Sequence, residues 1–147
     1  MNIRPCSSRK RSLTGGNEVY LLDTNIFLEV LLDREYSLVI RKLLNRENGL
    51  SFFISDFSLY SIGIFLTHKK IAEQYARFID DLEARDIGII SLSPDELRQI
   101  PTVCTQYGMD FDDAYQYVAA GANNLQLVSL DHDFDRIPTG RVHPKDI

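Results

Sequence analysis

The 147-residue chain has few cysteines, no apolar stretch after its basic first residues of the kind expected in a secretory leader, and no apolar run long enough to span a bilayer. Its two cysteines, Cys6 and Cys104, cannot form a disulfide framework, and no Cys/His cluster has the spacing of zinc ligands. The most apolar segment, 50–66, is interrupted by Asp56 and is shorter than the roughly 20 residues of a membrane helix. These absences argue against secreted and membrane-spanning proteins and predict a reduced, cytoplasmic protein.

The chain also lacks an excess of basic residues. Sixteen Lys and Arg stand against 21 Asp and Glu, which gives a net charge of −5. This balance argues against a protein that coats nucleic acid by bulk attraction, because phosphate affinity comes largely from Lys and Arg. Residues 1–17 have four basic residues and no acid, so they carry +4, and with the whole chain at −5 the other 130 residues carry −9. Carboxylates therefore collect in the body of the chain.

Two regions follow from the residue pattern. Residues 1–17 are rich in Ser, Gly, Arg and Lys and show no apolar period, which predicts a disordered basic tail; a vector remnant and a nucleic-acid-binding arm are alternatives. Residues 18–147 contain no repeat and no linker, which predicts a single domain.

Within this domain, short apolar runs alternate with segments of helical spacing. Strands are predicted at 19–22, 50–54, 87–90 and 125–130, and helices at 26–32, 36–44, 57–67, 71–82, from 93 onward and at 110–122. Ser93 to Glu96 has the pattern of a capping box with Pro in the first turn. The alternation predicts a three-layer α/β/α sandwich around a mostly parallel sheet.

Three aspartates are predicted to meet at one edge of this sheet. Asp23 and Asp131 each follow a predicted strand near its carboxyl end, where open α/β sheets bind ligands, and Asp113 lies in the first turn of the helix before the last strand. Six aspartates and no Lys or Arg occur from 110 to 135. Carboxylates held close together raise one another's pKa, and a divalent cation relieves this repulsion. Hard oxygen ligands suit Mg²⁺ or Mn²⁺, which can activate water and stabilise a phosphodiester transition state.

Each of these carboxylates also has a structural interpretation. Asp23 could cap the helix that follows it, and Asp113 could complement the dipole of its helix. The acidic residues after the last strand could form a solvated turn: Asp131, Asp133 and Asp135.

Three segments resemble the PIN-domain ribonucleases, particularly the small prokaryotic VapC-type toxins. These segments are 19–25, 111–114 and 127–134, and their order and spacing suit the family across essentially all of 18–147. The resemblance implies a PIN-like central parallel sheet flanked by helices, and a metal-dependent endoribonuclease that hydrolyses RNA phosphodiester bonds with Mg²⁺ or Mn²⁺.

The resemblance also implies residue roles. Asp23, Asp113 and Asp131 correspond to the catalytic, metal-binding acids of the family. Thr24 and Ser129 occupy positions where the family commonly has Ser or Thr, and Asn25 lies in the first matching segment.

One position departs from the family pattern. The family usually has a glutamate on the helix after its second strand, and Ser61 falls at that position. A neutral serine can at best hold a metal-bound water. Asp56 could replace the glutamate only in a shifted register, whereas Asp133 could supply the charge from another element. An active VapC-like toxin and a catalytically weakened or inactive PIN-fold binding or assembly module therefore both remain open.

The resemblance to the toxins implies three kinds of partner, namely RNA, a cognate antitoxin that covers the pocket, and a second copy of the chain. Basic side chains outside the pocket are candidates for RNA binding, although solvated helix faces explain them equally well: Arg41, Lys42, Arg46, Lys69 and Lys70. The apolar stretch 57–66 could supply a partner surface or simply belong to the core.

Overall fold

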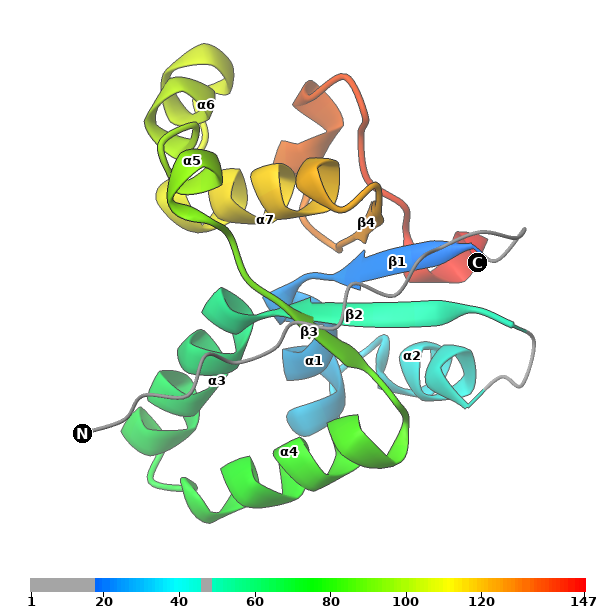
Figure 1. The fold of residues 1–147 in the computed structure, drawn as a ribbon. Coiled ribbons are helices and arrows are strands. Elements are labelled where there is room, and N and C mark those ends of the chain that lie inside the picture. The colour runs from blue at the N-terminus through cyan, green and yellow to red at the C-terminus, as the bar shows by residue number, and fades with distance from the viewer. Residues whose placement is uncertain (1–17, 46–48) are drawn as a thin grey trace.

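The computed structural model describes residues 18–45 and 49–147 (Figure 1). The predicted basic tail at 1–17 and the candidate RNA-binding residue Arg46 lie outside these residues. Within the described ranges, no helix has the length and apolar character that crossing a membrane requires.

A four-stranded parallel sheet with the order β3-β2-β1-β4 forms the centre of the described part of the chain. Its strands are β1 (Val19–Leu22), β2 (Ser51–Ser55), β3 (Gly88–Ile90) and β4 (Gln126–Val128). The helices are α1 (Thr24–Leu31), α2 (Ser37–Leu44), α3 (Asp56–His68), α4 (Glu73–Ala84), α5 (Pro94–Leu97), α6 (Ile100–Tyr107) and α7 (Phe111–Ala122), followed by the short 3₁₀ helices η1 (His132–Arg136) and η2 (Pro144–Asp146).

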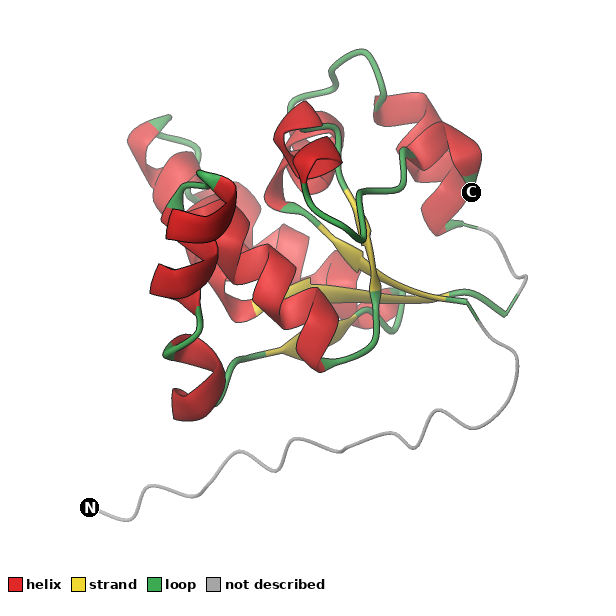
Figure 2. Ribbon diagram, turned by 90° about the horizontal axis from the view of Figure 1, so that it is seen from above, coloured by secondary structure: helices red, strands yellow, loops and turns green. Residues whose placement is uncertain are grey.

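The helices cover the sheet in two layers. Helices α1 to α4 lie on one side and α5 to α7 on the other (Figure 1), and the strands cross at an angle when seen from above, as in a twisted sheet (Figure 2). The predicted three-layer α/β/α sandwich is confirmed.

Strand β1 separates the two hydrophobic cores. Tyr20 and Leu22 belong to the core beneath the sheet and Leu21 to the other core, as the alternation of side chains along a strand requires. All three are buried, which explains why this central strand is a continuous apolar run.

The helix expected from Ser93 onward is two helices. The capping box is present, because the Ser93 hydroxyl accepts from the Glu96 amide and the Glu96 carboxylate accepts from the Ser93 amide. Helix α5 then ends at Leu97 and α6 begins at Ile100. Pro101 lacks an N–H and its ring clashes with the carbonyl four residues earlier, which is that of Leu97, so a continuous helix cannot form.

The register of the strands positions the candidate site. Leu22 pairs with Val128, so Asp23 and Ser129 leave their strands side by side, and the Asp23 amide donates to the Val128 carbonyl at 3.0 Å. Because the strands are parallel, β2 ends at the same edge, at Ser55. Residues far apart in the sequence are thereby brought together at the carboxyl edge of the sheet.

Candidate metal centre

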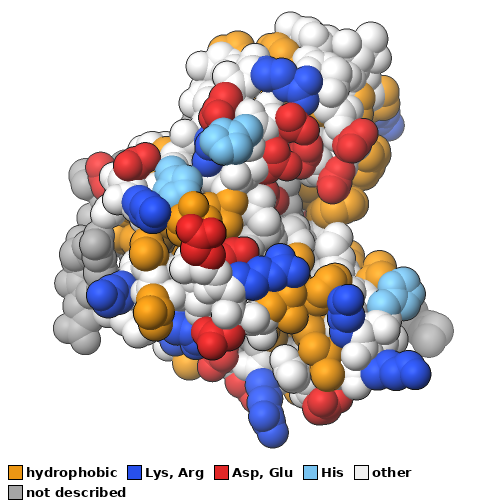
Figure 3. Space-filling view, turned by 180° about the vertical axis from the view of Figure 1, so that it is seen from behind, with side chains coloured by type: hydrophobic (Ala, Val, Ile, Leu, Met, Phe, Trp, Pro, Cys, Tyr) orange, Lys and Arg blue, Asp and Glu red, His pale blue; other side chains and the backbone are white. Residues whose placement is uncertain are grey.

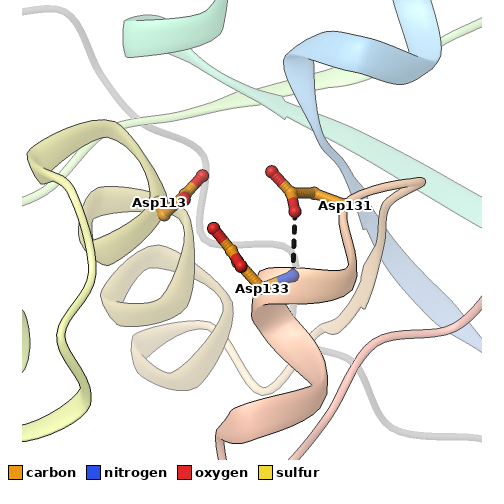
Figure 4. Close-up of side chains that lie close together, drawn as sticks. All are labelled: Asp113, Asp131 and Asp133. Atoms are coloured by element: carbon orange, nitrogen blue, oxygen red, sulfur yellow. Dashed lines mark hydrogen bonds between the residues drawn. The ribbon is translucent and has the colours of Figure 1, made fainter.

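Three carboxylates form a tight cluster at this edge. Asp113, Asp131 and Asp133 each offer an oxygen, and these oxygens all lie within 4.8 Å of one another (Figure 4). Asp113 comes from the first turn of α7, and the other two come from the turn after β4, where Asp131 caps η1. The Asp131 carboxylate accepts from the Asp133 amide at 2.8 Å. Asp133 also pairs with Arg136 at 3.1 Å, so its charge is partly offset.

Asp23 lies beside this cluster but is not one of its three members. It is only 6 % exposed and caps α1, so the capping interpretation of this residue is correct. Its Oδ1 accepts from the Thr24 amide at 2.7 Å, and its Oδ2 accepts from the Asn25 amide group at 2.9 Å and from the Ser129 hydroxyl at 2.7 Å. Asp23 is thus a buried carboxylate held in one orientation by three donors.

Asn25 and Ser129 connect Asp23 to the acidic turn. The Ser129 hydroxyl donates to Asp23 and accepts from the Asp131 amide and the Asn25 side chain, both at 3.0 Å, which uses its full hydrogen-bonding capacity. The Asn25 carbonyl oxygen in turn accepts from the Leu130 amide at 3.2 Å. The position of Asp131 is therefore fixed relative to Asp23.

Burial and mutual repulsion act on two of the carboxyl groups. Burial raises the pKa of Asp113 to about 7, and the charges of Asp112, Asp23, Asp131 and Asp133 raise it too. Burial likewise raises the pKa of Asp23 to about 6, although hydrogen bonds from Ser129 and the Thr24 amide act in the opposite direction. Holding these groups ionised at neutral pH is unfavourable, and a cation would reverse that.

The chemistry of the donor set fits one class of cation. All candidate ligands are carboxylate oxygens, which are hard donors that suit Mg²⁺ or Mn²⁺ rather than the softer metals bound by cysteine and histidine. The three carboxylates therefore fit the predicted cofactor, Mg²⁺ or Mn²⁺.

A buried polar network that the sequence reasoning missed lies next to these residues. Gln116, one turn after Asp113 on α7, is buried and donates to the Ser58 hydroxyl at 2.6 Å. Ser58 also shares a hydrogen bond of 2.8 Å with Thr24 and accepts from Ser55 at 3.2 Å. The Gln116 side-chain oxygen is buried, and among the described residues it has no hydrogen-bond partner. A glutamine on the otherwise apolar inner face of α7 was the available signal.

Ser61 stands where the family usually has a glutamate, and Asp56 and Asp133 are the two carboxylates that could replace it; the structure places these three residues differently. Ser61 lies half-buried on α3, one turn after Ser58. Asp56, the first residue of α3, accepts from the Tyr115 hydroxyl at 2.5 Å and from the Phe57 amide at 2.7 Å. Of these two carboxylates, Asp133 and not Asp56 is a member of the cluster with Asp113 and Asp131.

Arg141 supports the acidic turn and was also missed by the sequence reasoning. Its side chain is only 8 % exposed and donates to the Ser129 carbonyl and to the Asp135 carboxylate, both at 3.0 Å. A buried guanidinium thus ties the end of β4 to η1. Nothing in the local sequence around Arg141 distinguishes it from a surface arginine.

The basic residues proposed to bind RNA lie on the surface. Arg41, Lys42, Lys69 and Lys70 are exposed. Arg41 also donates to the carbonyl of Val30, which ties it to α1. Their exposure is compatible with RNA binding and with solvated helix faces alike.

The apolar stretch 57–66 is divided between core and surface. Ile62 and Leu66 are buried, whereas Tyr60 is 65 % exposed and Ile64 is also exposed. The stretch therefore both belongs to the core and leaves an apolar strip on the outside of α3.

Comparisons with known proteins agree with this architecture. A family model described as "PIN domain" matches residues 20–140. None of the curated proteins compared with the chain matches it significantly.

Solved structures with the same fold include three toxin-antitoxin systems. A toxin-antitoxin complex from Klebsiella pneumoniae is 21 % identical with a TM-score of 0.67, covering 87 % of this chain and 99 % of that chain. VapBC2 from Rickettsia felis, bound to a DNA fragment from its promoter, is 24 % identical with a TM-score of 0.65, covering 84 % and 96 %. VapBC-1 from nontypeable Haemophilus influenzae is 17 % identical with a TM-score of 0.65, covering 84 % and 95 %.

Proposed function

The chain belongs to the PIN domain family, whose model spans 20–140, and from this premise we propose that it is a divalent-metal-dependent endoribonuclease. One observation carries the proposal: Asp113, Asp131 and Asp133 direct oxygens within 4.8 Å of one another at the edge of the sheet. Such a group is unfavourable without a cation, and the family supplies the reaction class.

The residues have distinct proposed roles. Asp113 and Asp131, with Asp133, hold Mg²⁺ or Mn²⁺, and Asp23 adds a buried negative charge as the fourth acid. Asn25 and Ser129 orient Asp23 and Asp131 through the hydrogen bonds described above. When bound, the metal supplies Lewis-acid activation of water and stabilisation of charge on the phosphodiester. The carboxylates accept the hydrogen bonds that orient the attacking water.

We further propose that the protein is a VapC-type toxin of the cytoplasm, with a cognate antitoxin as its partner and a homodimer as its assembly. The support is the likeness of its fold to chains in toxin-antitoxin structures from Klebsiella pneumoniae and Rickettsia felis. The exposed apolar strip on α3, which includes Tyr60 and Ile64, offers surface for such contacts.

A second candidate function rests on Ser61. A site that lacks the carboxylate usual for the family on α3, and in which Asp133 is paired with Arg136, could bind metal too weakly for catalysis. The protein would then be a PIN-fold module that binds RNA or a protein partner without cleaving.

Calorimetric titration with Mn²⁺ separates these functions. We expect the unmodified protein to bind Mn²⁺, and Asp131→Asn/Asp133→Asn to lose at least about 100-fold in affinity, since even groups that only orient metal ligands contribute roughly 10- to 100-fold. Asp80→Asn/Asp81→Asn on the exposed face of α4 removes the same charge and should bind normally. Equal affinity in the two double variants would refute the metal centre.

Restoring a carboxylate at position 61 is the complementary prediction. Ser61→Glu is expected to raise Mn²⁺ affinity by about tenfold, because added ligand charge strengthens the binding of hard cations. Ser61→Gln, which has the same length without the charge, is the control. The measurement is again calorimetry, together with a thermal melt to establish folding. Unchanged affinity in a folded Ser61→Glu protein would mean that position 61 does not face the site.

A further inference from the structure

An exposed aromatic side chain lies two residues before Asp113 of the carboxylate cluster. Phe111 is the first residue of α7 and is 54 % exposed, so its ring is not part of the core. It contacts Phe57 at 6.0 Å between ring centroids, and Phe57 stacks on Tyr115 at 5.2 Å with an interplanar angle of 29°. These three rings, which we call the aromatic ladder, run from the core to the surface.

The inner end of the ladder is fixed. Tyr115 is buried, and its hydroxyl donates to Asp56 at 2.5 Å and accepts from the Leu92 amide at 3.3 Å. Phe57 lies in the first turn of α3, which Ser55 caps, and its amide donates to the Asp56 carboxylate at 2.7 Å. The supporting rings therefore cannot easily turn away, and Phe111 rests on a rigid base with about half of its surface open to solvent.

The ladder and the carboxylates share one edge of the sheet. Phe111 and Asp113 lie in the same turn of α7, and Phe57 is the second residue of α3, the helix that follows β2. The face drawn in Figure 3 is hollowed between α5, α6 and α7 above and α3 below. Acidic side chains gather along the upper edge of this hollow, and hydrophobic side chains lie on both sides of it. A strand of nucleic acid that reaches Asp113 also reaches the first turn of α7, which begins with Phe111.

The net charge of residues 18–147 bears on how RNA can bind beside the exposed Phe111 ring. Residues 18–147 carry −9, so they repel phosphates, and affinity for RNA has to include a contribution that does not depend on charge. Stacking of a base on an aromatic ring is such a contribution, and it tolerates every base because each has a π-face. Paired bases in a duplex do not offer that face.

We propose that Phe111, supported by Phe57, is a stacking surface for one unpaired base of a single-stranded RNA substrate. The inference rests on the proposed ribonuclease function and assigns to Phe111 a role in holding its substrate. Phe111 holds a base and thereby places the neighbouring backbone at the carboxylates of α7 and η1.

Fluorescence anisotropy with a labelled 12-nucleotide oligouridylate tests the proposal. Binding is measured with Mn²⁺ in an Asp113→Asn background, so that the RNA stays intact. Phe111→Ala should weaken binding by about tenfold or more, the range of one lost base stack. Phe111→Trp should preserve binding, and Phe111→Leu should lose nearly as much as Ala because it is apolar without a π-face. Leu38→Ala, which removes a 70 % exposed side chain from α2, should have no effect.

The outcomes separate this inference from the proposed function. Suppose that the unmodified protein cleaves RNA, but that Phe111→Ala or Phe111→Leu has the same affinity for the oligouridylate as the protein that retains Phe111. The stacking surface is then refuted, and the proposed ribonuclease function is unaffected. If Phe111→Ala leaves RNA affinity unchanged but shifts elution in size-exclusion chromatography, the ladder is a protein-binding surface and the proposal is wrong. A protein that binds duplex and single-stranded RNA equally would also overturn it.

Discussion

Asp113→Asn is expected to lower the rate of Mn²⁺-dependent RNA cleavage by more than about 100-fold, since a direct metal ligand should matter at least as much as the groups that orient one. Asp113 offers one of the three clustered oxygens. Asparagine has the same shape but no charge, so it is a weaker ligand for a hard cation. Initial rates of cleavage of a fluorescent single-stranded RNA give the measurement.

The same substitution should stabilise the metal-free protein at alkaline pH. Burial, with repulsion from the neighbouring carboxylates, raises the pKa of Asp113 to about 7 from its usual value of 3.8. Between these two pH values Asp113 is protonated in the folded protein but ionised in the unfolded chain. Its contribution to the free energy of unfolding is therefore fully present below pH 4 and is lost as the pH rises through 7. Asparagine avoids this loss. After allowance for solvent screening, the gain in free energy of unfolding at pH 8 is about 1–2 kcal/mol.

Urea denaturation at pH 8 and pH 4 measures this gain, which should vanish at the lower pH. Asp80→Asn on α4 is the matched control, because Asp80 is exposed and far from the cluster in sequence. It should alter neither stability nor cleavage. If Asp113→Asn lowers stability at pH 8, or if the variant still cleaves RNA, Asp113 does not belong to a metal site whose carboxylates repel one another.

Asp23, Asp113 and Asp131 could be predicted from the sequence because each rests on a local pattern. Asp23 follows a short apolar run typical of a buried strand, Asp131 comes shortly after the last such run, and Asp113 lies in the first turn of a helix with a clear apolar face. Rules for parallel sheets then place strand ends at a common edge. The order of strands was not needed for this step, since every parallel strand ends on the same side.

The contact between Ser58 and Gln116 could not be predicted because it depends on packing. They are 58 positions apart and uncharged, and each interrupts an apolar helix face only once. Sequence periodicity cannot distinguish a buried serine from a small residue that fills space. The orientation of Asp133 is likewise set by η1, whose first turn forms when Asp131 accepts from the Asp133 amide. A short 3₁₀ turn has no apolar period that would reveal it.

Mn²⁺ is expected to raise the midpoint of thermal unfolding by about 5–10 °C at pH 8 and by only about 1 °C at pH 5. A metal concentration of 100 times Kd stabilises a protein by about 2.7 kcal/mol, and each kcal/mol shifts the midpoint by about 2–4 °C for a chain of this size. Burial raises the pKa of Asp113 to about 7, so protons compete with the metal. At pH 5 this competition weakens binding by about 100-fold, which leaves about 0.4 kcal/mol.

The pH at which this stabilisation disappears identifies the carboxylates that bind the metal. Carboxyl groups with the ordinary pKa of 3.8 are ionised throughout the range from pH 5 to 8, and their affinity for Mn²⁺ would stay nearly constant. Asp113 and Asp23, whose pKa values burial raises to about 7 and about 6, lose their charge within this range. Melting curves at half-unit steps of pH, with an equal ionic strength of NaCl as the control, trace the transition. The same shift at pH 5 and pH 8 would place Mn²⁺ on exposed carboxylates, and the proposed metal centre at the sheet edge would be wrong.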